Sequence, residues 1–143
     1  MFSQPIRSIM EPRKLLIAPS QTTVLKAAEM MAKKQVGAVL VVDNEHLVGI
    51  FTERDAVFRV IARGLEPTST VLADVMTRDP KTIAPEKPYG LAMTLMHESG
   101  FRHLPVIEDG KPIGIISSRN ALDPDLEEFV SEERRRKHFQ ETR

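Results

Sequence analysis

Residues 49–55 read Gly-Ile-Phe-Thr-Glu-Arg-Asp, and residues 114–120 read Gly-Ile-Ile-Ser-Ser-Arg-Asn. Sliding the chain against itself by 65 residues aligns all of Ala27–Asp55 with Ala92–Asn120 without a gap, with six identical pairs. Upstream of this block the offset becomes 66, which indicates one inserted residue between Pro19 and Ala27. The chain of 143 residues is therefore predicted to contain two copies of one structural unit.

Both copies also repeat a helical pattern of apolar residues. These recur at i, i+3, i+4 and i+7, at Val24, Ala27, Ala28 and Met31 in the first copy and at Tyr89, Ala92, Met93 and Met96 in the second. Such spacing is typical of a helix that buries one stripe against a core. Because both helices bury the same stripe, a pair of units related by a pseudo-twofold axis is the simplest arrangement.

Each copy is predicted to run strand, helix, strand, strand, helix. The first has a strand near 14–17, a helix at 23–34, strands at 38–42 and 47–52 joined by a turn, and a helix from 53 to about 63 that Gly64 caps. The second has a strand at 81–83, a helix at 88–98, and strands at 103–107 and 112–117 joined by a turn. Strands mixed with helices in this order predict an α/β fold (α+β by some schemes).

The chain is predicted to divide into residues 1–66, 67–122 and 123–143, of which the first two ranges hold the two copies. Asp123-Pro124 interrupts the helix that should follow Arg119, because the residue before a proline is pushed away from helical geometry. A charged C-terminal helix is expected from there. Its acidic pair 127–128 and its basic run 134–137 follow the order that the helix dipole favours.

The composition excludes several classes of function. The absence of cysteine excludes disulfides, thiolate chemistry and cysteine-type zinc sites. Twenty basic residues balance twenty acidic ones, so no overall field draws the chain to nucleic acid or to an anionic membrane. Apolar runs such as 38–42 are far shorter than the ~20 residues that span a bilayer, and residues 1–7 lack the apolar stretch of a secretory signal. We therefore expect a soluble, cytoplasmic protein.

The repeated junction between strand and helix is the first candidate site. A helix start presents unpaired N–H groups that suit a phosphate, to which Arg54 or Arg119 adds a guanidinium and Thr52 or Ser117 a hydroxyl. Asp55 can accept hydrogen bonds from both hydroxyls of a ribose. An ordinary helix cap explains either junction taken alone. Repetition of the arginine, and of a glycine that allows close backbone approach, favours a ligand site.

Residues 100–106, which align with residues 35–41, form the second candidate segment. They lie at the start of the central strand of the second copy, where backbone groups can read the edge of a purine. Arg102 and His103 would lie near phosphates held by the neighbouring copy. The alternative for His103 is a polar side chain exposed at a strand start.

In this order and spacing, the segments 49–55 and 100–106, supported by 114–120, resemble a tandem pair of CBS domains, the regulatory module named after cystathionine beta-synthase. The resemblance covers about Ile6 to Leu122. It implies two units packed through their sheets, with two clefts between them that take an adenosine-containing ligand: AMP, ADP, ATP, NAD or S-adenosylmethionine. It also implies that such pairs associate into discs of four repeats, so a homodimer is expected.

Carried over by position, the resemblance implies that Asp55 holds a ribose, that Thr52 and Arg54 face phosphate, and that Gly37-Ala38 meets the adenine. In the other cleft Asn120 stands where the family has aspartate, and an uncharged amide predicts weaker binding there. The predicted nucleotide-binding residues are Lys14, Leu16, Ile17, Gly37, Ala38, Thr52, Arg54, Asp55, Pro80, Thr82, Arg102, His103, Ser117, Arg119 and Asn120.

Enzyme motifs are absent from the sequence, which has no nucleophile elbow, no HExxH spacing and no P-loop, and its four histidines are scattered. We expect no catalytic residue and no metal site. The predicted function is a signal-sensing module that binds an adenosyl ligand and passes its occupancy to an unknown protein partner by conformational change. The alternative is a module that binds protein or nucleic acid through the basic C-terminal helix. A basic run this short is more typical of a solvated helix end, so nucleic acid is not favoured.

Overall fold

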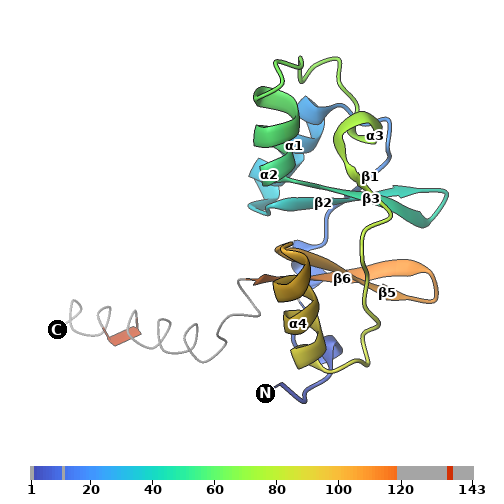
Figure 1. Ribbon diagram of the computed structural model, residues 1–143, viewed down its shortest axis with the longest axis vertical. Helices are drawn as coiled ribbons and strands as arrows, with labels where there is room; N and C mark the ends of the chain where they lie inside the picture. Colours follow the sequence, from blue (N-terminus) through green and yellow to red (C-terminus); the bar gives the residue numbers. More distant parts are fainter. Residues whose placement is uncertain (1, 11, 119–134, 137–143) are drawn as a thin grey trace.

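The computed structural model describes residues 2–10, 12–118 and 135–136. The first copy consists of β1 (Ile17–Ala18), α1 (Val24–Lys34), β2 (Ala38–Asp43), β3 (His46–Thr52) and α2 (Glu53–Asp55), which continues as the π-helix η3 (Ala56–Ile61). The second consists of α4 (Tyr89–Ser99), β5 (His103–Glu108) and β6 (Lys111–Ser117). The two sheets face each other at the centre, with helices on the outer sides (Figure 1). The predicted α/β fold of two packed units is confirmed.

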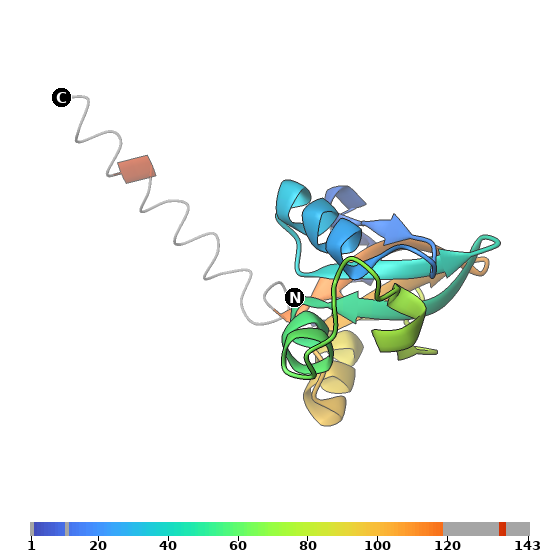
Figure 2. The same cartoon turned by 90° about the horizontal axis from the view of Figure 1, so that it is seen from above.

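The two copies share one strand register. In the first, β1 runs parallel to β2, which forms an antiparallel hairpin with β3, and β4 (Thr77–Arg78) adds an edge to β3. In the second, β5 and β6 form the equivalent hairpin. Both hairpins carry a bulge at the same position, after Val41 and after Val106. Seen from above, the strands of the two copies lie over one another (Figure 2).

Local sequence explains where these elements begin and end. The hydroxyl of Thr23 caps α1 by accepting a backbone N–H at 3.2 Å. Gly100 ends α4 at a φ of 73°, in the left-handed region that glycine adopts freely. Both hairpin turns place two consecutive residues at positive φ, Asn44-Glu45 and Asp109-Gly110, which is the geometry that matches the twist of the flanking strands.

The first strand of each copy is shorter than predicted. Around residues 14–17 the chain forms a 3₁₀ turn, η2 (Pro12–Lys14), and only then β1. The strand predicted at 81–83 is reduced to a single bridge between Ile83 and Val106. In the first copy the N–H of Leu40 donates to the carbonyl of Leu16, directly before β1, at 2.8 Å. Pro105 takes that position in the second copy and has no N–H to donate, so the pairing does not extend.

The helix after β3 is wider than the α-helix predicted over residues 53–63. The N–H of Ala62 donates to the carbonyl of Val57, five residues back, at 2.9 Å, as in a π-helix. Gly64 lies at a φ of 68° and ends the helix as predicted. π-helical turns are rare and frequently lie at functional sites.

Two short segments cross over between the copies. The 3₁₀ helix η1 (Ile6–Ser8) precedes the first copy but packs on the second, where the N–H of Ile6 donates to Lys87 at 2.9 Å. Helix α3 (Leu72–Val75) precedes the second copy but packs on the first, where the N–H of Leu72 donates to Thr22 at 2.9 Å. This reciprocal exchange was not predicted, and it ties the two copies into one body.

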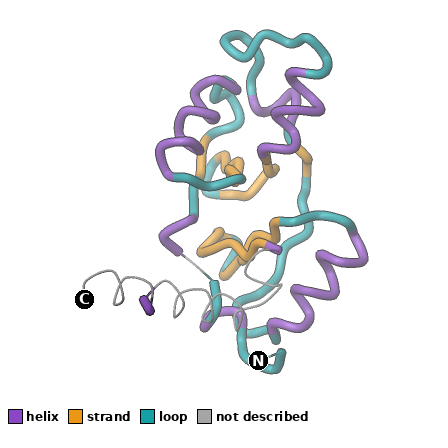
Figure 3. Tube along the Cα trace, turned by 90° about the vertical axis from the view of Figure 1, so that its left-hand side faces the viewer, coloured by secondary structure: helices purple, strands orange, loops and turns teal. Residues whose placement is uncertain are grey.

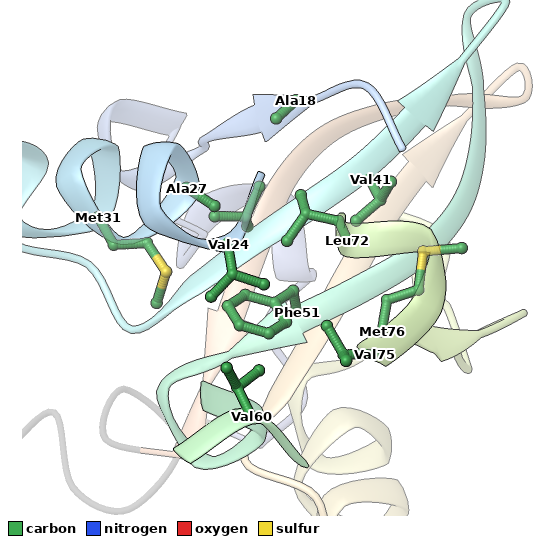
Figure 4. Packing of buried hydrophobic residues seen from close by; sticks show 11 residues of the cluster. Ala18, Val24, Ala27, Met31, Val41, Phe51, Val60, Leu72, Val75 and Met76 are labelled. Atoms are coloured by element: carbon green, nitrogen blue, oxygen red, sulfur yellow. The ribbon is translucent and has the colours of Figure 1, made fainter. Parts of the chain in front are cut away.

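Each copy has its own apolar core between sheet and helices, and a third cluster joins the sheets. The first core contains Ala18, Val24, Ala27, Met31, Val39, Val41, Phe51, Val60, Leu72, Val75 and Met76 (Figure 4). The second is built around Tyr89, Leu104 and Ile116 and includes Ile6 from the exchanged segment. Between the sheets, Leu40 and Ile50 of the first copy pack with Ile115 of the second. Strands therefore occupy the centre of the trace and helices its outside (Figure 3).

The predicted helix of residues 123–143 lies outside the described residues, apart from Arg135 and Arg136. Arg119 and Asn120 also lie outside them. Within the described ranges, no helix combines the length and the apolar character needed to cross a bilayer.

Candidate functional site

Two clefts open between the copies, and side chains from both copies line each of them. The larger, of about 980 Å³, contains Thr52, Arg54 and Asp55 and is called the Asp55 cleft. The smaller, of about 760 Å³, contains Gly37 and Ala38 and is called the Gly37 cleft. Both volumes suit a ligand of nucleotide size.

The Asp55 cleft joins the β3–α2 junction of the first copy to two segments that lead into the second. The first copy supplies Thr52 to Asp55 and the π-helical residues Val57 and Phe58. Opposite them lie Asp79 to Lys81 and the second predicted segment, Gly100 to His103. The predicted residues Pro80, Arg102 and His103 thus share one cleft with Thr52, Arg54 and Asp55.

The Gly37 cleft is the pseudo-symmetric counterpart. It joins Lys14, Gly37 and Ala38 of the first copy to Ser117 and Ser118 of the second. This differs from the predicted grouping, in which Gly37-Ala38 meets the base of the ligand whose ribose Asp55 holds. Glu53, at the start of α2, lines both clefts, and its N–H donates to the carbonyl of Gly37 at 3.0 Å.

Four residues line both clefts and form their common wall: Glu53, Val57, Arg102 and His103. The carboxylate of Glu53 covers the backbone of Gly37, where a Cβ would lie 3.1 Å from its Oε1. Burial lowers the pKa of His103, with Glu53 acting in the opposite direction and Arg102 in the same direction as burial. The charges of Glu53, Arg102 and His103 therefore act on a ligand in either cleft.

Thr52 and Asp55 form a capping box at the start of α2. The carboxylate Oδ2 of Asp55 accepts from the N–H of Thr52 at 2.9 Å and from its hydroxyl at 3.1 Å, and the N–H of Asp55 donates to the Thr52 hydroxyl at 3.3 Å. The helix-cap interpretation is thus present in the structure. These bonds, with that of Glu53 to Gly37, use backbone donors that were expected to bind phosphate. The backbone N–H groups of Thr52, Glu53 and Asp55 are therefore already hydrogen-bonded.

Three cationic side chains line the same cleft as the carboxylate of Asp55, whose side chain is 13% exposed. Arg54, Lys81 and Arg102 line the same cleft and can approach a phosphate. The guanidinium of Arg54 lies 5.3 Å from the ring centre of Phe58, which holds it at the cleft rim. The cleft thus combines one partly buried carboxylate, which can accept hydrogen bonds from hydroxyl groups, with three cations.

Some predicted residues lie elsewhere. Leu16 packs against the first core, while Ile17 and Thr82 are exposed and line neither cleft. Lys14 and Ser117 line the Gly37 cleft. Among the described residues, no group of three acidic or histidine side chains is arranged to hold a metal ion.

Several cleft residues were not predicted: Glu53, Val57, Phe58, Asp79, Lys81, Phe101 and Ser118. Glu53 and Ser118 carry a usable signal, because both directly follow the hydroxyl residue of the repeated junction. Phe58 lies four residues after Arg54 and so on the same helix face. No sequence pattern marks Asp79 and Lys81 as cleft residues. They line the cleft because the segment that connects the two copies passes along it.

Comparisons of the sequence and of the structure with known proteins point to the same family. The model of the CBS domain matches residues 6–62 and again residues 72–125. The CBS domain-containing protein CBSCBSPB3 of Arabidopsis thaliana is 39% identical over 110 residues, which are 76% of this chain and 20% of that protein. The chain thus spans about a fifth of the length of the first curated relatives that it matches.

Two solved structures illustrate the shared fold. A candidate signal-transduction protein with CBS domains from Burkholderia ambifaria is 34% identical, with a TM-score of 0.73 over 78% of this chain and 82% of that one. The CBS domain protein PAE2072 of Pyrobaculum aerophilum, solved in complex with AMP, is 22% identical, with a TM-score of 0.74 over 81% of this chain and 88% of that one. The latter likeness concerns the fold alone.

Proposed function

The chain belongs to the CBS domain family, and from this premise we propose that it is a non-catalytic regulatory module that binds an adenosine-containing ligand in the Asp55 cleft. The observation that carries the proposal is the partly buried carboxylate of Asp55, which lines one cleft built from both copies together with Arg54, Lys81 and Arg102. A carboxylate can accept both hydroxyls of a ribose while the cations bind phosphate. The complex of PAE2072 with AMP is in keeping with this ligand class.

A ligand in this cleft contacts both copies and can therefore change their relative packing. On one side it meets residues 52–55, and on the other residues 79–81 and 100–103. The shift in equilibrium is limited by the difference in ligand affinity between the two arrangements. A partner protein that reads the arrangement completes the proposed signal path.

The Gly37 cleft is proposed as a weaker second site. Its junction belongs to the second copy, where the sequence has Asn120 in place of the aspartate. An amide oxygen carries no charge and cannot accept as two carboxylate oxygens do. The cleft is also narrowed by Glu53, whose carboxylate lies against Gly37.

We further propose that two chains pair in solution, in the cytoplasm, and that residues 1–66 and 67–122 act as the two regulatory copies. In support of pairing, η3 exposes Val57, Phe58 and Ile61 by 51%, 60% and 69%. Exposed apolar side chains that cluster on one helix favour association. Sedimentation equilibrium should give a mass near twice 16.1 kDa, whereas the mass of one chain would contradict the pairing.

Calorimetry with AMP, ADP, ATP, NAD and S-adenosylmethionine tests the ligand proposal. The wild type should bind at least one of them, and Asp55→Ala should weaken that binding about tenfold or more, since a hydrogen-bonded charge is removed. Because Asp55→Ala also removes a helix cap, Thr23→Ala is the matched control: it removes the cap of α1, outside both clefts, at a similar cost of about 1 kcal/mol. Thr23→Ala should bind as the wild type does.

Failure of all five ligands to bind would contradict the proposal. The interaction role of the basic C-terminal helix would then be the better account, and titration with a random double-stranded DNA at two salt concentrations would test it. A steep loss of affinity with salt is expected only if nucleic acid is the ligand.

A further inference from the structure

We propose that Arg59 positions the carboxylate of Asp55 and links the Asp55 cleft to the segment that connects the two copies. The inference rests on the proposed function, because it concerns what happens when a ligand engages Asp55. Arg59 lines neither cleft, so it acts through Asp55 rather than on the ligand.

The first half of the link is the contact with Asp55. Oδ2 of that carboxylate is held by the N–H and the hydroxyl of Thr52. Oδ1 faces Arg59, whose Nε lies 3.5 Å away. Arg59 follows Asp55 by four residues, so the two side chains lie on the same helix face. The oxygen left for a ligand hydroxyl is thus the one that Arg59 orients.

The second half is the contact with the connecting segment. Nη1 of Arg59 donates to the carbonyl of Met76 at 3.1 Å and, at a longer 3.4 Å, to that of Val75. These carbonyls lie at the end of α3, where the last helical carbonyls lack partners within the helix. A guanidinium has donors on separate nitrogens in a rigid plane, so one group can hold the carboxylate and the carbonyls together.

The segment held by Arg59 runs directly into the cleft. After Met76 the chain forms β4 on the edge of β3, and residues 79–81 then line the Asp55 cleft opposite the carboxylate. Asp79 adopts a φ of 46°, which a residue other than glycine rarely does, immediately before Pro80. Arg59 therefore connects the wall that contains Asp55 to the segment that leads into residues 79–81 of the opposite wall, without lining the cleft itself.

The sequence of the second copy does not supply the corresponding pair of side chains. At the offset of 65 residues, Asp55 corresponds to Asn120 and Arg59 to Pro124, which has no side-chain donor. The asymmetry confines the proposed transmission to the Asp55 cleft. A ligand hydroxyl that donates to Oδ1 of Asp55 competes with Arg59 for this oxygen and shifts the guanidinium. The shift reaches residues 75–81 through the hydrogen bonds of Arg59 to the carbonyls of Val75 and Met76.

The test compares Arg59→Met with the matched control Arg78→Met. Arg78 is an arginine of the same segment and also donates to a backbone carbonyl, that of Ala73 at 3.0 Å, but it lines neither cleft. AMP is the probe. Its Kd is measured by calorimetry, and amide hydrogen exchange over residues 76–79 is measured without AMP and at AMP concentrations that saturate each variant.

In the wild type, AMP should change exchange at residues 76–79. Arg59→Met should raise the Kd for AMP about fivefold, as for loss of one partly exposed charged contact, and should abolish the AMP-dependent change in exchange even at saturation. Arg59→Lys keeps a charge and should restore part of both effects. Arg78→Met should match the wild type in both.

The inference is overturned if Arg59→Met, when saturated with AMP, shows the same exchange change as Arg78→Met. In that outcome the wild type still binds AMP and Asp55→Ala still loses it, so the proposed function survives. If the wild type binds none of the adenosyl ligands, the proposed function and this inference fail together.

Discussion

Met76 lies directly over the α-carbon of Gly49, so closely that a Cβ on this glycine would come within 2.4 Å of the methionine sulfur. Met10 has the same relation to Gly114, where the corresponding distance is 2.8 Å. The glycine of the repeated junction therefore does not make room for a ligand, as its sequence position suggested. It allows a methionine that follows an exchanged segment to pack against the strand, Met76 on Gly49 and Met10 on Gly114.

Gly49→Ala should lower the free energy of unfolding by about 1–3 kcal/mol, because the added methyl group displaces a buried methionine. In a Met76→Ala background the same substitution should cost little, since the clashing side chain is gone. Urea denaturation of the single and double variants measures this coupling. Equal costs in both backgrounds would show that the contact does not constrain the glycine.

Acid should weaken the first copy through Asp43. The N–H and the hydroxyl of buried Ser20 donate to its carboxylate at 3.0 and 2.5 Å, and these hydrogen bonds hold the pKa of Asp43 below its ordinary value. A depressed carboxyl pKa stabilises the fold above about pH 4 and loses that contribution as the pH falls through the folded-state pKa. Thermal unfolding of Asp43→Asn between pH 6 and pH 2 should therefore show a shallower decline than that of the wild type.

Asp109→Asn is the matched control for this acid effect. Asp109 is exposed at the tip of the second hairpin, at a positive φ that asparagine also adopts. Its pH profile should follow that of the wild type. A profile as shallow as that of Asp43→Asn would assign the effect to net charge rather than to Ser20.

His103 should make stability depend on pH near neutrality. Burial lowers its pKa, so the folded protein holds the neutral ring while the unfolded chain takes up a proton below about pH 6.5. Stability should therefore be full above about pH 6.5 and should fall as the pH drops from there to the folded-state pKa. His103→Gln should flatten the decline between pH 7.5 and pH 5.5 in denaturant titrations, and an unchanged decline would contradict the assignment.

Ligand binding should raise the pKa of His103, in the direction opposite to the effect of burial. A phosphate in the Asp55 cleft adds negative charge beside His103 and raises its pKa, so AMP binding should take up protons. Calorimetry at pH 6.5 in buffers of different ionisation enthalpy measures the net uptake, and comparison with His103→Gln separates the ring from the phosphate of AMP, whose own pKa is about 6. Equal apparent enthalpies in all buffers for the wild type would contradict the prediction.

Glu53→Gln should strengthen binding of phosphate ligands about two- to fivefold, because it removes a negative charge from the wall shared by the two clefts. The gain should be larger for ATP than for AMP, since ATP carries more charge. Glu29→Gln, on the exposed side of α1 and outside both clefts, removes the same charge and should leave affinity unchanged. Equal effects of the two substitutions would indicate a change in overall field only.

Much of the fold was predictable from local patterns. Of the predicted stripe, Val24, Ala27 and Met31 are buried, whereas Ala28 is exposed and lines the Gly37 cleft. The hairpins turn where their polar residues indicated. These features depend on residues a few positions apart, whose periodicity and φ preferences the sequence carries directly. The short first strand of the second copy was harder to predict, because a single proline at position 105 removes a hydrogen-bond donor from the strand pairing.

Only part of the candidate site was predictable, because the sequence did not indicate residues such as Phe58 and Lys81 or the grouping into two clefts. Thr52, Arg54 and Asp55 lie together because they fall within the four residues of one helix start. Their neighbours Lys81 and Arg102 come from the other copy, and no local pattern connects them to Asp55. The π-helical turn that brings Val57 and Phe58 to the cleft was equally hidden, since its apolar spacing resembles that of an α-helix.

The sequence by itself determined a duplicated α/β unit, its helices and hairpins, and a repeated junction rich in hydrogen-bonding side chains, because these depend on interactions between near neighbours. Only the tertiary structure decided which side chains share a cleft, which methionine covers which glycine, and that Arg59 holds the connecting segment to Asp55. These depend on how two copies pack and exchange segments, and the free energy of that packing comes from apolar surfaces far apart in the chain.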